Sequence, residues 1–326
     1  MAIIYFIIIL GLIIFIHELG HFILAKRNGV YCYEFSLGMG PKIFSFKRKA
    51  PDETTYSLRL FPIGGFVQMA GEEIEQDKNI PEENRMQSKT IWQRFKIIVA
   101  GAFNNFILGL LLLFLISIIY GSYEIKPYIG EVSESYGAYT AGVISGDLIK
   151  SINGKTVNTI DDVLLEIELI DDTETVTMVL EDFDSNTRTI EITPTMDEET
   201  DSYVYGFSLA STRTYGLKNA ITYTFSEFVS IYKSMFVVLK NLITGGLSIN
   251  SLSGPVGIYN IVDEQSKIGF ENIIYLAAFI SINVGFINLL PFPALDGGRV
   301  LFLIIEKIRK RPINQKVENT INLIGF

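Results

Sequence analysis

Cysteine and histidine are both scarce in this sequence of 326 residues, which has one cysteine, Cys32, and two histidines. A single cysteine excludes an internal disulfide and a cysteine-rich zinc ribbon. Any metal site must therefore use histidine and carboxylate ligands. Basic residues are also in deficit, because 27 Lys and Arg face 36 Asp and Glu. That balance argues against nucleic acid as a partner, since phosphate binding needs a basic face.

Charged residues of either sign make up only 19% of the chain, and the 48% that are hydrophobic gather in blocks. A transmembrane helix needs about 20 apolar residues. The block at 1–26 carries Glu18 as its only charge up to residue 25, and the block at 97–122 carries none. A third block, 271–305, holds only Asp296 and Arg299 as charged residues after Glu271, and it is interrupted by prolines and a glycine pair. We therefore predict three membrane spans, the third of them broken.

Both ends of the chain bear on the number of spans. The first block lacks the basic start and the small-residue cleavage site of a signal peptide, so we expect it to be retained. Residues 306–326 form a basic segment that ends in INLIGF, which is similar to the start of a truncated fourth span.

Charge is distributed unevenly along the chain, and residues 121–220 hold 19 acidic and 6 basic residues. We interpret this block as a separate soluble domain. The positive-inside rule places segments rich in Lys and Arg in the cytoplasm, and therefore the N-terminus and the acidic domain outside. The basic clusters follow the first span (Lys26, Arg27, Lys42, Lys47, Arg48, Lys49) and the third (Lys307, Arg309, Lys310, Arg311, Lys316).

The cytoplasmic region 27–96 contains two alternating segments, KIFSFK and TTYSLRLF, on either side of KAPDE. This pattern predicts a β-hairpin between Tyr31 and Gln68. It is either an ordinary cytoplasmic hairpin or a ribbon that enters the bilayer, where its backbone must be shielded.

The acidic region 125–212 contains IGEV followed by AGVISGDLIKSINGKTV. Asn153-Gly154 between two apolar runs predicts a type I′ hairpin turn. The region resembles a bacterial PDZ domain, which implies peptide C-termini as partners; an unrelated small β-rich domain is the alternative. The predicted fold class is thus a polytopic α-helical membrane protein of three to four transmembrane helices, with a membrane-associated β-hairpin and one inserted α+β PDZ-like domain.

Residues 218–247 alternate aromatic clusters with sparse charges, which is typical of an amphipathic helix. This helix lies either at the membrane interface or against the soluble domain, and we expect amphipathic interfacial helices over 213–268.

The two histidines, His17 and His21, stand four residues apart with Glu18 between them, in the sequence HELGH. On a helix, positions i and i+4 share a face, so both imidazoles can reach one Zn²⁺, with Glu18 beside them to activate water. A structural role for these residues is disfavoured, because an ionisable residue deep in an apolar span is costly. The pattern therefore indicates a catalytic zinc site.

Two histidines leave a catalytic zinc one protein ligand short of the usual three. The broken span offers Asp296 in NLLPFPALDGGR, where prolines and glycines free the backbone. The alternative is that Asp296 forms an ion pair with Arg299 within the membrane.

These motifs together resemble the site-2 protease family of intramembrane zinc metalloproteases, of the bacterial RseP/RasP type. The motifs are HELGH, the PDZ-like insert and N-x-x-P-x-P-x-L-D-G-G, and the resemblance covers nearly the whole chain. It implies that His17, His21 and Asp296 bind zinc, that Glu18 is the catalytic acid and base, and that Asn288 helps to hold substrate.

The resemblance also implies the setting. We expect a multi-pass protein of the bacterial cell membrane, in contact with the lipid bilayer, with its active site toward the cytoplasmic side. The implied substrate is a single transmembrane segment that has already been clipped outside, such as an anti-sigma factor or a signal-peptide remnant. Pro291 and Pro293 belong to the same substrate-binding motif as Asn288. In the second span Ala102 stands where the family commonly has proline, although the spacing from Gly101 to Asn105 is kept.

A different class of protein remains open, namely a membrane scaffold or zinc carrier in which the metal is not catalytic. A catalytic zinc needs an open position and a base, so Glu18 favours the protease.

Overall fold

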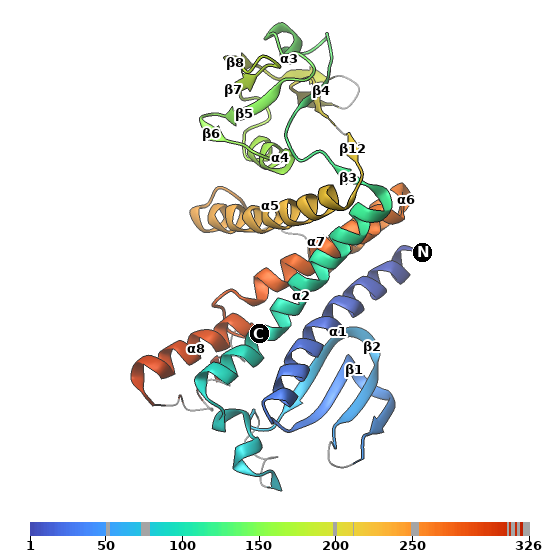
Figure 1. Ribbon diagram of the computed structural model, residues 1–326, viewed down its shortest axis with the longest axis vertical. Coiled ribbons are helices and arrows are strands. Elements are labelled where there is room, and N and C mark those ends of the chain that lie inside the picture. Colours follow the sequence, from blue (N-terminus) through green and yellow to red (C-terminus); the bar gives the residue numbers. More distant parts are fainter. Residues whose placement is uncertain are drawn as a thin grey trace. The chain divides into compact units, whose positions relative to one another are not determined.

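The computed structural model describes the chain except for residues 50–52, 73–78, 198–200, 211, 249–253, 312, 314–316, 318–319 and 322–326. It divides into two compact units (Figure 1). Unit 1 comprises residues 1–112 and 253–326, and unit 2 comprises residues 113–252. The predicted start of a fourth span, at 321–326, lies almost wholly outside the described residues.

Among the described residues, three helices are long and apolar enough to cross a membrane: α1 (Ala2–Arg27), α2 (Ile91–Tyr120) and α7 (Phe270–Asn288). The helix α2 begins six residues before the predicted span. Its start is fixed by Thr90 and Gln93, because Gln93 N donates to Thr90 Oγ1 at 3.3 Å and Gln93 Oε1 accepts from Thr90 N at 3.0 Å. This reciprocal capping box satisfies backbone groups at the helix start.

The region after α1 forms two long strands, β1 (Cys32–Lys47) and β2 (Thr55–Met69), which pair antiparallel. Their pairing is more extensive than a simple hairpin, because both strands bend back on themselves. Residues 32–37 pair on one side with 65–69 and on the other with 55–58, and residues 42–47 pair with 55–59. Residues 65–69 therefore form one edge of the resulting sheet.

One face of this sheet packs on α1, and Figure 1 shows β1 and β2 beside that helix. The contact is aromatic: Phe35 lies 5.7 Å from Phe15 and 5.1 Å from Phe22 between ring centroids, and Phe22 lies 5.8 Å from Tyr56. Aromatic pairs at these separations add to the free energy gained from burying their area. The sheet is thereby fixed against the helix that carries the HELGH sequence.

The sheet also holds a buried carboxylate, Glu34, within a polar network. Glu34 accepts hydrogen bonds from Lys42 Nζ at 2.8 Å, Arg59 Nη2 at 2.8 Å and Ser57 Oγ at 2.5 Å. Two of these donors are cationic, and they offset the cost of burying the carboxylate. The carboxylate is thus held in its charged form inside the sheet.

The third apolar region is divided into two helices, as predicted for a broken span. Helix α7 ends at Asn288, residues 289–295 are not helical, and α8 (Asp296–Arg309) begins at Asp296. A side chain at Gly297 would meet the Leu290 carbonyl oxygen at 2.2 Å, so only glycine allows α8 to pack this closely on the break. Buried Glu306 accepts from Arg94 Nη1 at 2.6 Å, which ties α8 to α2.

Helix α6 (Pro255–Ile268) packs against α1 and α7. Val262 is fully buried in the apolar cluster that these helices share, and Tyr259 lies 6.0 Å from Phe6 between ring centroids. The apolar side chains around Val262 are therefore covered by other helices of unit 1, whereas Val256 and Ile268 near the ends of α6 are exposed.

Unit 2 is an α+β domain (Figure 1). Apolar side chains of its strands and of α4 are buried together. A four-stranded antiparallel sheet has the order β6-β5-β7-β8, and β4 pairs with β11, β9 with β10 and β3 with β12. The bounds are β3 (Ser122–Tyr123), β4 (Ile129–Val132), α3 (Gly137–Thr140), β5 (Leu148–Ile152), β6 (Lys155–Thr156), α4 (Ile160–Glu168), β7 (Val176–Glu181), β8 (Thr187–Ile192), β9 (Thr195–Asp197), β10 (Ser202–Val204), β11 (Phe207–Leu209) and β12 (Arg213–Thr214).

The predicted type I′ turn is confirmed between β5 and β6. Asn153 has φ 48° and Gly154 has φ 79°, and Ile152 pairs with Lys155 across them. Two successive positive φ values define this turn, and glycine adopts them without steric cost.

Helix α5 (Leu217–Thr244) presents two opposite faces within unit 2. One face is buried and contacts α4, and there Ser230 Oγ lies 3.4 Å from Thr159 Oγ1. The other face carries exposed apolar side chains, namely Leu217, Ile221, Phe225, Val229, Phe236 and Ile243. The helix therefore packs on the soluble domain through one face and offers an exposed apolar surface on the other.

Candidate metal centre

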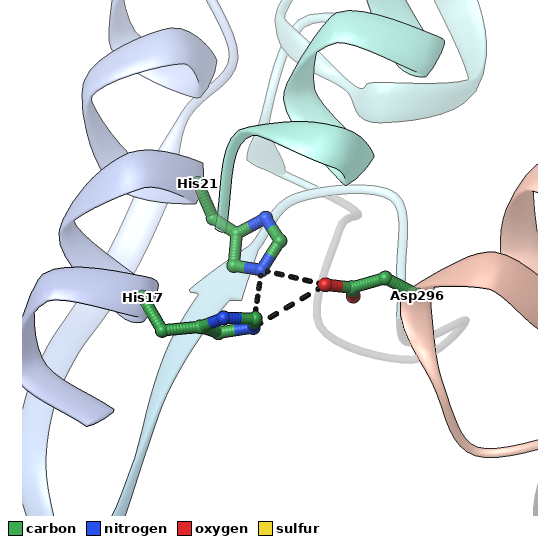
Figure 2. Close-up of side chains that lie close together, drawn as sticks. All are labelled: His17, His21 and Asp296. Carbon is green, nitrogen blue, oxygen red and sulfur yellow. Dashed lines mark hydrogen bonds and ion pairs between the residues drawn. The ribbon is translucent and has the colours of Figure 1, made fainter. Parts of the chain in front are cut away.

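The two histidines of α1 point to the same side of the helix, as the four-residue spacing predicts (Figure 2). Their Nε2 atoms lie 3.1 Å apart. His21 is buried and His17 is half-buried.

Asp296, the first residue of α8, points at both imidazoles (Figure 2). Its Oδ2 atom lies 3.3 Å from His17 Nε2 and 3.3 Å from His21 Nε2. Arg299 instead pairs with Glu72, with Nη1 2.6 Å from Oε1. The alternative ion pair between Asp296 and Arg299 is therefore not the arrangement that the structure adopts.

The three converging atoms have the spacing that a zinc ion requires. Ligands about 2.0 Å from a tetrahedral ion lie about 3.3 Å from one another. The observed separations of 3.1, 3.3 and 3.3 Å agree with that value. Asp296 Oδ2 is buried and has no hydrogen-bond donor. A buried carboxylate oxygen needs a partner, and a bound cation would supply one. These residues fit a zinc ion held by three protein ligands.

The face of α2 that lies against the histidines was not assigned any role in the sequence. His21 Nδ1 lies 2.8 Å from the Ile97 carbonyl oxygen, and His17 Nδ1 lies 3.2 Å from Asn105 Nδ2. Between them is Gly101, where an added Cβ would come within 2.3 Å of His21 Nε2 and 2.7 Å of His17 Nε2. Glycine at this position is what leaves room for both rings.

A cavity of about 270 Å³ opens at these residues. Glu18 and Asn288 both line it, whereas Pro291 and Pro293 are not part of its lining. Asn288 Nδ2 donates to the Val284 carbonyl at 2.9 Å, so one of its amide hydrogens is already engaged. The remaining lining comes from β2, α2, the loop after β2 and the broken segment with α8: Phe66, Val67, Met69, Ile97, Ile98, Glu72, Ala294 and Arg299.

The model of peptidase family M50 matches residues 5–326. The regulator of sigma-W protease RasP of Bacillus subtilis is 34% identical, and the alignment covers 99% of this chain and 94% of that protein. The zinc metalloprotease RasP of Bacillus licheniformis is also 34% identical, with the same coverage. Among solved structures, the PDZ domain of an SdrC-like protein from Listeria monocytogenes matches 27% of this chain and 90% of its own, with 19% identity and a TM-score of 0.24.

Proposed function

The chain belongs to peptidase family M50, and on that basis we propose that His17, His21 and Asp296 hold its zinc and that Glu18 is the general base. The enzyme is a zinc-dependent intramembrane protease. The observation that carries the assignment of residues is the convergence of Asp296 Oδ2 on both Nε2 atoms at 3.3 Å.

The reaction is hydrolysis of a peptide bond in the cavity that Glu18 shares with the three ligands. Zinc, when bound, supplies a Lewis acid that makes a water more acidic and polarises a peptide carbonyl. The Glu18 carboxylate takes the proton from the attacking water and later delivers it to the leaving amine. The aromatic contacts between the sheet and α1 keep Glu18 and its cavity on a rigid support.

The substrate that we propose is the transmembrane segment of a single-span protein already clipped outside the membrane, of the anti-sigma-factor or signal-peptide-remnant type. The name of the Bacillus subtilis relative, regulator of sigma-W protease RasP, supports the first of these. A helical segment hides its carbonyls and must unwind before hydrolysis. Asn288 faces the cavity and can hold the unwound backbone, and Pro291 and Pro293 keep the neighbouring segment out of a helix.

Incubation of the purified protein with a panel of transmembrane-segment peptides tests this function. We expect at least one peptide to be cleaved, cleavage to stop when a zinc chelator is added, and activity to return with zinc. A membrane scaffold or zinc carrier would bind zinc and leave every peptide intact.

The orientation in the membrane is a further proposal, in which the acidic unit 2 lies outside the cell and the active site lies toward the cytoplasm. It is supported by the basic residues after α1 and in α8. A cysteine placed at Asp171 should react with an impermeant label in intact cells, and one at Lys47 only after permeabilisation. Both positions are exposed, and the buried Cys32 is replaced by serine to remove background. The opposite labelling pattern would refute this orientation.

The exposed apolar face of α5 is proposed to lie in the interface region on the outer side of the cell membrane. The start of α5 is tied to the end of a membrane span, because Arg213 Nη1 donates to the carbonyl of Tyr120, the last residue of α2, at 2.8 Å. Arg213 begins β12, and α5 starts only a few residues later at Leu217. A helix that starts at this level with an apolar face gains free energy by burying that face among lipid chains.

The bent sheet is proposed to enter the bilayer from the cytoplasmic side. Its strands expose several large apolar side chains, and two of its charged side chains, Lys42 and Arg59, are paired with Glu34. The exposed apolar residues are Met39, Ile43, Phe44, Phe46, Leu58, Leu60 and Phe61.

Residues 125–212 are proposed to act as a PDZ-like domain that binds extended peptide ends. A groove of about 890 Å³ runs between α4 and strands β4 and β11. It is lined by apolar residues of α4, including Leu164 and Ile167, and by the segment from Gly206 to Leu209, which contains β11. A strand edge beside an apolar groove favours peptide binding by strand addition.

A further inference from the structure

One face of α2 supplies a contact to each histidine. The contacts come from Ile97 and Asn105, which are two helical turns apart, and Gly101 lies midway between them. Positions separated by four residues stack on one side of a helix, so these three form a continuous stripe. This stripe of α2 lies outside both the HELGH motif and the broken segment.

When an imidazole binds a metal ion through Nε2, its Nδ1 needs a hydrogen-bond acceptor. A neutral histidine that binds an ion through Nε2 carries its proton on Nδ1, and that proton needs an acceptor. For His21 the acceptor is the Ile97 carbonyl, 2.8 Å from Nδ1. For His17 the group at Nδ1 is the amide of Asn105.

The amide of Asn105 can meet this requirement in one of its two orientations. With Nδ2 toward His17 at 3.2 Å, Asn105 Oδ1 is buried and has no hydrogen-bond partner. Rotating the amide by half a turn exchanges the oxygen and the nitrogen, which are nearly equal in shape. Oδ1 then accepts the proton of His17 Nδ1, as the metal-binding tautomer demands.

We propose that Asn105 is a positioning residue, whose Oδ1 accepts the His17 Nδ1 proton and so holds Nε2 toward Asp296 for metal binding. Asn105 is suited to this task because it is completely buried and its backbone carbonyl accepts from Ser281 Oγ of α7 at 2.8 Å. The inference rests on the proposed role of His17 as a zinc ligand.

Two substitutions separate this role from simple filling of space. Asn105→Asp keeps an acceptor oxygen at nearly the same size, whereas Asn105→Leu keeps the size and removes the acceptor. We expect Asn105→Leu to weaken zinc affinity by about 10- to 100-fold, and Asn105→Asp to stay within about threefold of the unmodified protein. Affinity is measured by competition with a zinc chelator. A packing role would favour the apolar leucine over a buried aspartate, and so predicts the reverse order.

The matched control is Asn104→Leu. Asn104 is the adjacent asparagine of α2, and its Nδ2 donates to the Ile16 carbonyl of α1 at 3.2 Å, whereas the Asn105 amide faces His17 Nδ1. This variant should bind zinc with unchanged affinity. Equal losses for Asn104→Leu and Asn105→Leu would overturn the proposal.

A second measurement holds even if Asn105→Leu fails to fold. The protein has only two histidines, so ¹⁵N-histidine labelling yields just two imidazole spin systems. In the zinc-bound unmodified protein, both rings should carry their proton on Nδ1. A ring with its proton on Nε2 would overturn the proposal. Failure of the unmodified protein to bind zinc would instead refute the proposed function, so the two failures are distinguishable.

Discussion

Replacing Glu18 with glutamine should abolish cleavage while leaving zinc bound. Glutamine has almost the same size, so the cavity and the three ligands should be preserved. It cannot accept a proton from water, and general-base catalysis typically contributes about 10²- to 10⁴-fold to a rate. Cleavage of a transmembrane-segment peptide should fall by about this factor.

Zinc content is the control for this variant, because Glu18 lies in the cavity without being one of the three converging ligands. The Glu18→Gln protein should contain as much zinc as the unmodified protein. Near-normal turnover would place the general base elsewhere in the chain.

Removal of the Asp296 carboxylate should cause the largest loss of metal. Asp296→Ala leaves two histidines, and an underfilled site binds zinc weakly. We expect the zinc content of the purified variant, measured by elemental analysis, to fall from one ion per chain to near zero. Activity should disappear with it.

Arg299→Gln is the matched control, because Arg299 lies one turn further along α8 and pairs with Glu72. Losing that ion pair removes one tie between α8 and the loop after β2, but it removes no ligand. Zinc should therefore be retained. Stoichiometric zinc in Asp296→Ala would show that the third ligand is a different residue.

The sequence predicted best what depends on local geometry. The spacing of His17 and His21 predicts a shared helix face, and the structure has their Nε2 atoms 3.1 Å apart. Asn153-Gly154 likewise predicts its own turn. Asp296 was reached through its unusual setting, a carboxylate beside a proline- and glycine-rich break, and the structure brings it to the histidines.

Non-local pairings were beyond the reach of the sequence. Alternation in the segments around KAPDE predicts strands, but it does not show that residues 32–37 pair on both sides. The role of Asn105 was missed because its partner lies 88 positions earlier in the chain. The available signal was that an otherwise apolar span contains two adjacent asparagines, Asn104 and Asn105, since buried amides in a span need partners.

Because the chain is synthesised from its N-terminus, Asp296 is added long after the two histidines that it contacts. The two histidines leave the ribosome near the beginning of the chain, and the carboxylate that completes their ligand set follows near its end. At about 5 to 20 residues per second, the intervening stretch of about 280 residues takes roughly 15 to 55 seconds to make. During that interval α1 and α2 can already be in the membrane with the histidines beside Gly101, but the proposed site lacks its third ligand. A chain that stalls before α8 therefore remains without the third ligand of the proposed metal centre.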